Sequence, residues 1–500
     1  MACNHDGNPG FASRRTFLSD VGMGFTGLVL GSMFSKEGLR NSALAAESSH
    51  VASEHLPGQP HFPPKAKSVI WIFLTGGLSH LESFDHKPEI TKYAGLDISQ
   101  TPHRDVLNAS FNGNVRIVVP NDANGRMRNT LYPTQVGFKK YGQSGLEISD
   151  WFSHIGQCAD DLAIVRSVWT TDNNHGAQLQ FHTGRHILDG QFPTIGSWIN
   201  YGLATENESL PSFVVLGQPI ADCCGGIGAH GANYLGPEHS GVQLGVDPKN
   251  PLPFSFPQGG IYREEQRKEF ELLSKLHDIS AVEYPEDATL SARIRSYELA
   301  FRMQSALPSV MNSDQETKET RQLYGFDRKE TRVFARQCLA ARRLVEKGVR
   351  FVQLFHGSNG GAGGWDAHRK LNARHSTLSN QIDQPIAALI KDLKRTGLLD
   401  ETLVVIGTEF GRTPGTQGVD GRDHHPFAFS VVMAGGGLKG GLTHGRTDAL
   451  GFHAIEDRHF VTDIHATILH QLGLDSRKLE IPGRKRLDID HGSPIKSIIA

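Results

Sequence analysis

Two short stretches of this 500-residue chain gather side chains that can bind a metal ion. Glu409 directly follows a buried-type, β-branched apolar run, and Asp423, His424 and His425 precede a second one. Carboxylate oxygens and imidazole nitrogens are the usual ligands of divalent metals such as zinc and manganese. Ligands bind at the carboxyl ends of the strands in open α/β sheets. The pattern therefore predicts a metal site at that edge of a sheet.

A third stretch, the glycine-rich segment after the run Val349–Phe355, contributes Asp366 and His368. Because the two residues are only two positions apart, a loop must present both side chains. Structural alternatives stay open for these acids. Asp366 could cap the helix that follows it, and Glu409 could pair with Arg412.

A fourth stretch places Asn174 and His175 between the run Leu162–Val168 and an expected helix, Ala177–Thr183. The free N–H groups and the dipole at a helix N-terminus suit anion binding. His175 could bind a metal, act as a general base or accept a phosphoryl group. Asn174 could instead be a simple helix N-cap.

The elements that must position these residues are apolar runs alternating with helical patterns. This alternation predicts an α/β fold with a mainly parallel central sheet and helices on both faces. Residues 220–347 read as a helical insertion, irregular at first and then helical. The expected strands are Ser68–Thr75, Leu162–Val168, Phe213–Gly217, Val349–Phe355, 403–408 and 427–434, with a possible strand at Val115–Val119. The expected helices are Ala177–Thr183, Tyr262–Ser280, Leu290–Ala306, Glu330–Lys347, Ser376–Lys394 and Val461–Leu472.

The first 45 residues have the pattern of an export signal. SRRTFL at 13–18 is a twin-arginine pattern, a mildly apolar stretch follows, and ALA at 43–45 suits a cleavage site. The alternative is a basic tail with a short apolar helix. We expect a signal peptide over 1–45, a linker over 46–66, a folded domain over 67–500, and a periplasmic or extracellular location.

The composition excludes some classes of partner. The chain has 51 basic and 53 acidic residues, a net charge of −2, so nothing indicates a nucleic-acid-binding surface. After the leader, no apolar run reaches the roughly 20 residues that span a bilayer. The expected partner is a small-molecule or polysaccharide substrate; protein partners stay open.

Several motifs together resemble the alkaline phosphatase–sulfatase superfamily, and more narrowly a twin-arginine-exported bacterial family of unknown function within it. They are FLTGGLSHLESFDHKP after the first strand, NHGAQLQFHTGRH at 174–186, GGWDAH, TEFG at 408–411 and the closing VTDIHATILHQLGLD. The resemblance covers about 68–475. It implies an alkaline-phosphatase-like sheet, a bound divalent metal (zinc, manganese or calcium) and hydrolysis of sulfate or phosphate esters.

The resemblance also assigns roles. Asp366 and His368 resemble the ligands of one metal, and Glu409 resembles the Asp of another. His424 and His425 resemble a late His ligand, of which we favour His425. Arg185, which is not among these metal ligands, would neutralise a bound anion or form an internal salt bridge.

The chain departs from the superfamily pattern at three places. Thr75-Gly76 stands where a metal-binding Asp is usual, and Glu409-Phe410 stands where an Asp-His pair is usual. Asn174 occupies the position of the nucleophilic Cys, Ser or Thr and cannot act as one. One metal or a rearranged site is therefore expected in place of two. The leading hypothesis is an exported metal-dependent hydrolase, and the alternative is a catalytically degenerate metal-binding or scaffolding protein.

Overall fold

A computed structural model describes residues 58–108, 128–203, 205–252, 263–283, 288–358 and 361–500. The expected leader, most of the linker and the possible strand Val115–Val119 lie outside these residues. Nine strands form one sheet in the order β12-β4-β11-β8-β1-β7-β5-β6, with β15 beside β4. These strands are β1 (Ser68–Leu74), β4 (Leu162–Trp169), β5 (Phe213–Leu216), β6 (Val242–Leu244), β7 (Phe351–His356), β8 (Thr402–Gly407), β11 (Phe429–Ala434), β12 (Leu442–His444) and β15 (His459–Phe460).

The central part of this sheet is parallel. β1 pairs in parallel with β7 and β8, and β7 continues in parallel through β5 to β6. β11 runs antiparallel to both of its neighbours, β4 and β8. The prediction of a mainly parallel sheet is therefore confirmed, with one reversed strand among those that the structure describes.

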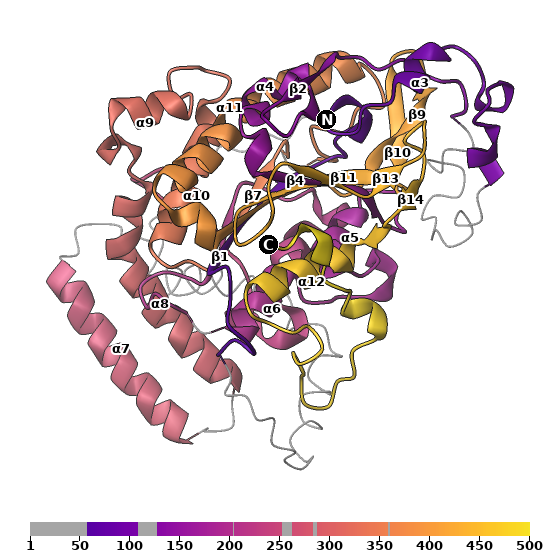
Figure 1. The fold of residues 1–500 in the computed structure, drawn as a ribbon. Helices are drawn as coiled ribbons and strands as arrows, with labels where there is room; N and C mark the ends of the chain where they lie inside the picture. Colours follow the sequence, from indigo (N-terminus) through magenta and orange to yellow (C-terminus); the bar gives the residue numbers. More distant parts are fainter. Residues whose placement is uncertain (1–57, 109–127, 204, 253–262, 284–287, 359–360) are drawn as a thin grey trace, which may run out of the picture.

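Strand β1 shows why the sheet is buried on both faces. Ile70, Ile72 and Leu74 belong to one hydrophobic core, and the alternating Val69 and Phe73 belong to a second. Helices cover both faces, as predicted (Figure 1). The first core is covered by α4 (Ser153–Gly156), α10 (Arg332–Glu346) and α11 (Leu371–Arg395), and the second by α5 (Ala177–Thr183), α6 (Ile195–Gly202) and α12 (Val461–Gln471).

The helical insertion is narrower than the predicted 220–347. Its helices α7 (Arg263–Glu283) and α8 (Ala288–Met311) form a hairpin, with Phe270 stacked on Phe301 (Figure 1). The C-terminal part of α8 enters the first core through Met303 and Leu307. In contrast, β6 is an edge strand of the sheet, and α10 packs against α11 and β7. Both belong to the core layers. The other α-helices in the described residues are α3 (Pro88–Lys92) and α9 (Lys318–Leu323).

The segment between Glu409 and β11, read as a loop in the sequence, is an antiparallel hairpin. Its strands β9 (Gly411–Gln417) and β10 (Gly421–His425) are almost entirely buried. The Asp-His-His cluster therefore lies on a strand of its own, outside the central sheet. Other small strands are β2 (Phe138–Tyr141), β3 (Leu146–Ser149), β13 (Arg446–Thr447) and β14 (Ala454–Glu456).

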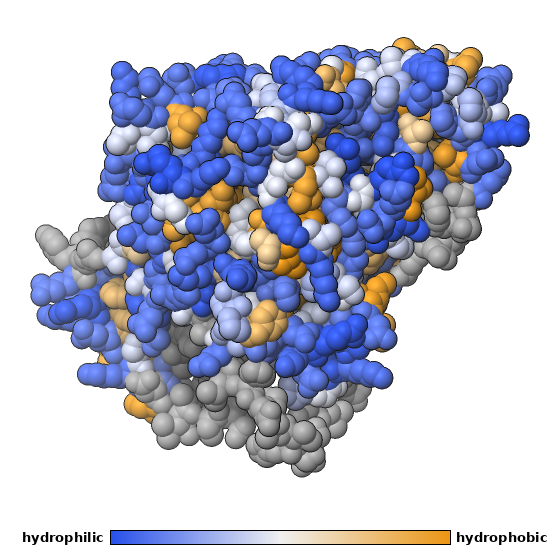
Figure 2. Space-filling view, viewed as in Figure 1, coloured by the Kyte–Doolittle hydropathy of each residue, from blue (hydrophilic) through white to orange (hydrophobic). Residues whose placement is uncertain are grey.

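The surface in Figure 2 is largely hydrophilic, with apolar residues scattered over it. None of the helices in the described part of the chain has the length and apolar character that crossing a membrane requires.

Candidate metal centre

The site forms where the carboxyl ends of parallel strands meet. Asp366 lies on the loop after β7, Glu409 is the second residue after β8, and His175 lies on the loop after β4. His424 reaches the same edge from β10, opposite Arg412 on β9. Segments that are hundreds of residues apart in the chain are thus brought together at the predicted edge of the sheet.

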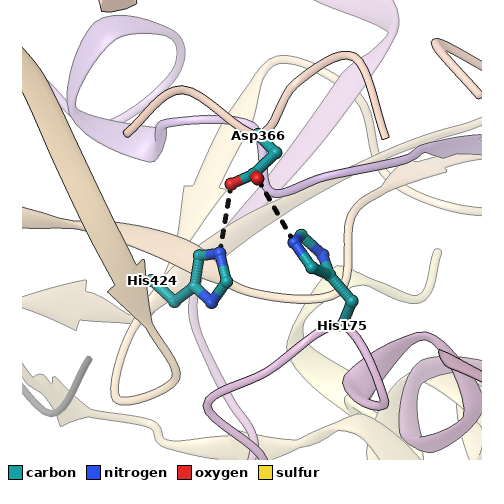
Figure 3. A group of neighbouring side chains, drawn as sticks. All are labelled: His175, Asp366 and His424. Atoms are coloured by element: carbon teal, nitrogen blue, oxygen red, sulfur yellow. Dashed lines mark hydrogen bonds and ion pairs between the residues drawn. The ribbon is translucent and has the colours of Figure 1, made fainter. Parts of the chain in front are cut away.

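The carboxylate of Asp366 is the centre of the cluster. Its Oδ1 lies 2.9 Å from Nε2 of His368 and 3.1 Å from Nε2 of His424. Its Oδ2 lies 3.5 Å from Nε2 of His175. Figure 3 shows His175 and His424 pointing at Asp366 from two sides. Three imidazoles therefore present the same ring nitrogen to one carboxylate.

The other nitrogen of each ring is held by an acceptor. Nδ1 of His175 lies 3.1 Å from Oε1 of Glu409, and Nδ1 of His424 lies 2.9 Å from the carbonyl oxygen of Asn173. Nδ1 of His368 contacts the side-chain oxygen of Gln417. In a neutral imidazole, donation from Nδ1 leaves Nε2 with a lone pair. This hydrogen-bonding arrangement is typical of metal-binding histidines, whose second nitrogen is fixed by a carboxylate or carbonyl.

Lone pairs that face a carboxylate repel it unless a cation or a proton lies between them. The ligand atoms of His175, Asp366 and His424 all lie within 4.8 Å of one another. Two ligands of a metal at 2.0–2.1 Å are about 2.9 Å apart at a right angle and about 3.3 Å apart in a tetrahedron. The separations of 2.9 and 3.1 Å around Oδ1 of Asp366 lie in this range, and the separation of 3.5 Å between Oδ2 and His175 lies slightly above it, so the residues present fit a divalent metal. His368, Asp423 and His424 form a second such group.

The electrostatics of the site are consistent with its geometry. Burial alone would raise the pKa of Asp366, but hydrogen bonds from three histidines and the charge of Arg412 hold it well below its usual range. Burial alone would lower the pKa of His175, but Asp366 and Glu409 raise it to about 9. Burial lowers the pKa of His424 well below its usual value, despite its hydrogen bond to Asp366. Asp366 is therefore ionised and ready to bind a cation.

Arg412 fixes the position of Asp366, a role that the sequence did not reveal. The fully buried guanidinium donates from Nη2 to Oδ1 of Asp366 at 2.9 Å and from Nε to the carbonyl oxygen of Gly77 at 2.9 Å. The contact considered from the sequence, Arg412 with Glu409, is thus replaced by one with Asp366. Gly76 packs closely against the backbone of Asp366. Its φ is +113°, and a Cβ there would lie 2.4 Å from the backbone nitrogen of Asp366.

Glu409 lies behind His175, outside the two groups of possible metal ligands. Its Oε1 accepts from the backbone N–H of Gly76 at 2.8 Å, and its Oε2 lies 3.1 Å from the hydroxyl of Thr408. The carboxylate is fully buried, and its Oε1 is shared between Gly76 and His175. Its position suits orientation of the His175 ring.

His424 faces Asp366, whereas His425, the histidine favoured from the sequence, does not. Neighbouring residues of a strand face opposite sides, so β10 turns His424 toward Asp366 and His425 away from it. Nε2 of His425 contacts the carbonyl oxygen of Phe452, and its ring stacks on His80 with centroids 6.4 Å apart.

Two other candidates have local partners. Arg185 forms an ion pair with Asp490 and lies over the ring of Phe192, 4.9 Å from its centroid. The internal salt bridge is therefore the alternative that the structure shows. The side chain of Asn174 accepts from the backbone N–H of His175 at 2.7 Å, whereas the residue at the N-cap of α5 is Gly176.

Comparison with other proteins places the chain in a family. The family described as "Protein of unknown function (DUF1501)" matches residues 66–499. The chain belongs to this family. No curated protein matches it in sequence.

Solved structures that overlay on the chain include phosphonate monoester hydrolase SpPMH from Silicibacter pomeroyi, with 11% identity, a TM-score of 0.33 and coverage of 69% of this chain and 71% of that one. The PsFucS1 sulfatase from Pseudoalteromonas sp. has 13% identity, a TM-score of 0.31 and coverage of 69% and 68%. The alkaline phosphatase from the Antarctic bacterium TAB5 has 11% identity, a TM-score of 0.28 and coverage of 82% and 98%. Overlays this weak assign no role to any residue of this chain.

Proposed function

We propose that this protein is a metal-dependent hydrolase of sulfate or phosphate esters. The observation that carries the proposal is the convergence of three imidazole Nε2 atoms on Asp366, with each Nδ1 held by an acceptor. The superfamily resemblance of the motifs supplies the substrate class. Because the donors are mainly imidazole nitrogens, we favour zinc over manganese and calcium, which prefer oxygen ligands.

A bound metal would supply Lewis acidity toward an ester oxygen and toward an attacking water. The residues of the chain would do the rest. Asp366, His175 and His424 would hold the metal, and Glu409 would orient His175. The side chain of His368 is 35% exposed, whereas those of His175 and His424 are 7% exposed. We infer that the substrate approaches from the side of His368.

Water is the nucleophile that the site supports best. Asn174 carries no nucleophilic group. The hydroxyl of Thr75 donates to the carbonyl oxygen of His356, and that of Thr408 donates to the carbonyl oxygen of Leu74. Both nitrogens of the remaining candidate, His175, face carboxylates. Direct attack by water predicts no burst of product and no covalent intermediate.

The alternative is a metal-binding or scaffolding protein that has lost catalysis. The observation in its favour is Asn174 at the nucleophile position, with its side chain bonded to the neighbouring backbone. This protein would retain the metal and release no product. Turnover of an ester that depends on Asp366 would exclude it.

The test combines metal analysis with turnover of aryl sulfate and aryl phosphate esters. We expect about one equivalent of metal and steady-state hydrolysis, both lost in Asp366→Ala and His424→Gln. His425→Gln is the matched control, since it changes an equally buried histidine on the same strand that faces away from Asp366. It should retain the metal. Protein without metal, or metal retention that is equal in His424→Gln and His425→Gln, would overturn the proposal.

We also propose that the protein acts outside the cytoplasmic membrane on small-molecule or polysaccharide esters. The twin-arginine pattern at 13–18 and the cleavage pattern at 43–45 support export in the folded state. Such a route would allow the metal to be inserted before export.

A further inference from the structure

A row of hydrogen bonds links four side chains at the edge of the sheet beyond β4. His444 ends β12, His459 begins β15, and both strands pair with β4. The Nε2 atoms of the two rings are 2.8 Å apart. Nδ1 of His459 lies 2.9 Å from Oδ2 of Asp463. At the other end, Nδ1 of His444 lies 2.9 Å from the hydroxyl oxygen of Ser497. The row therefore runs from a carboxylate through two imidazoles to a hydroxyl group.

The positions of the protons in this row follow from its carboxylate end. The carboxylate of Asp463 only accepts, so Nδ1 of His459 carries a proton and, in the neutral ring, Nε2 of His459 has a lone pair. Two lone pairs would repel each other at 2.8 Å, so Nε2 of His444 must donate. Nδ1 of the neutral His444 ring is then an acceptor, and the hydroxyl of Ser497 donates to it.

The two ends of the row differ in their exposure. Asp463 lies on α12, and its Oδ1 accepts from the backbone N–H of Ser493 at 2.8 Å. The side chain of Asp463 is 19% exposed and that of His459 is 16% exposed, whereas Ser497 is exposed. The carboxylate end is thus fixed and shielded, and the hydroxyl end is open to solvent.

We propose that Ser497 is a nucleophile that takes an acyl group from a carboxylic ester, at a site separate from the metal centre. A serine hydroxyl bonded to an imidazole, whose other nitrogen is held by a third group, is the arrangement that activates serine. Such an arrangement is identified by geometry and not by position in the sequence. The ammonium group of Lys439 donates to the carbonyl oxygen of Ser497 at 3.2 Å, so a cation lies beside the residue on which negative charge would develop.

The acylation step moves one proton and exchanges one bond. The hydroxyl oxygen of Ser497 attacks the carbonyl carbon of the ester, and its proton moves to Nδ1 of His444. The bond between the carbonyl carbon and the leaving alcohol breaks, and His444 gives the proton to that alcohol. The lone pair of His459, with the carboxylate of Asp463 behind it, stabilises the transient imidazolium. Water then attacks the acyl-serine with His444 as the base, which releases the acid and restores the hydroxyl.

The test uses the full-length protein with two probes, p-nitrophenyl acetate and diisopropyl fluorophosphate. We expect a burst of about one equivalent of p-nitrophenol, and a diisopropyl phosphoryl group on Ser497 identified by peptide mass spectrometry. Ser497→Ala should lose both. Ser309→Ala is the matched control and should keep both, because its exposed hydroxyl donates to the carbonyl oxygen of Ala306 and not to an imidazole.

Two further variants separate activation of the serine from a structural role. His444→Gln should slow acylation by about 100-fold or more, since this is the contribution of a general base. Asp463→Asn should slow acylation while the burst still reaches one equivalent. An amide N–H that donates to Nδ1 of His459 would reverse every donor in the row, so that Nδ1 of His444 would donate to Ser497. A purely structural role would lower the amplitude of the burst and leave its rate constant unchanged.

Three results would overturn the inference. One is the absence of a label on Ser497 in the folded protein, with folding checked by circular dichroism. Another is an acylation rate in His444→Gln equal to that of the unsubstituted protein. The third is loss of the burst after removal of metal with a chelator, which would assign the reaction to the centre at Asp366. We expect the burst to survive the chelator, because the groups of possible metal ligands in the described residues include no member of the row.

Discussion

Acid should unfold this protein steeply, because histidines buried in its core resist protonation. Burial lowers the pKa of His182 to about 3 and those of four others to about 4; the four are His230, His356, His453 and His465. In the unfolded chain these side chains titrate near pH 6.5. Below that pH the unfolded state binds protons that the folded state does not. Stability is therefore full above pH 6.5 and is lost as the pH falls toward 4.

The size of the effect follows from linkage. A histidine with a pKa of about 4 when folded and 6.5 when unfolded loses about 2 kcal/mol of stabilisation between pH 7 and pH 5. Five such groups together lose about 10 kcal/mol, which is comparable to the whole free energy of unfolding of a typical domain. At pH 5.5 these five groups alone should account for about four to five protons taken up on unfolding. Burial also lowers the pKa of His80, His375, His424 and His425, so these histidines add to the slope.

The assay is urea unfolding of the protein at half-unit steps from pH 7 to pH 5. His182→Phe supplies the internal check. The imidazole of His182 stacks on the ring of Phe355, with the two centroids 5.6 Å apart, and its centroid lies 4.5 Å from the centroid of Phe73. A phenylalanine at position 182 would keep these ring contacts. The substitution should reduce proton uptake by one and add about 2 kcal/mol at pH 5 relative to its effect at pH 7. An uptake of fewer than two protons on unfolding, or an uptake in His182→Phe equal to that of the unsubstituted protein, would refute the reasoning.

Three further perturbations test other parts of the structure. Glu409→Gln should weaken metal binding about 10–100-fold without abolishing it, as measured by competition with a chelator. An unchanged metal affinity would show that Glu409 is not needed to orient the ring of His175. Gly76→Ala should lower both the melting temperature and the metal content, because its Cβ would meet backbone at 2.4 Å, whereas Gly397→Ala, also at positive φ but with open space around it, should keep the metal. Replacement of Arg14 and Arg15 by lysine should leave an uncleaved precursor in the cytoplasm, read by fractionation and N-terminal sequencing; normal processing would contradict the export proposal.

The sheet could be predicted because its central strands are apolar on both faces. β1, β7 and β8 are buried along their whole length, and each appears in the sequence as a mostly apolar run, interrupted in β7 by Gln353. The predicted helical insertion, 220–347, was too long for a related reason. α10 is rich in charge, but its apolar side packs on the sheet, and composition alone does not show which side of a helix is covered.

The edge of the sheet that carries the site was also predictable, but the pairing of side chains was not. The segment Gly411–His425 contains glycine and proline and reads as a loop, so the alternation that separates His424 from His425 was hidden. Arg412 and Gln417 gave no signal of their own. Their importance comes from the hairpin, which places them against residues of the loop after β7.

The charges at the centre explain why a metal and an anionic substrate should bind together. Without metal, the raised pKa of His175 keeps this ring protonated at neutral pH, so His175 and Arg412 balance the carboxylates of Asp366 and Glu409. A divalent metal at Nε2 would take the place of one proton and leave the buried cluster with one excess positive charge. Burial makes such a charge costly unless an anion accompanies it. A sulfate or phosphate ester entering beside His368 would supply that anion, whereas a neutral ester would leave the excess charge uncompensated.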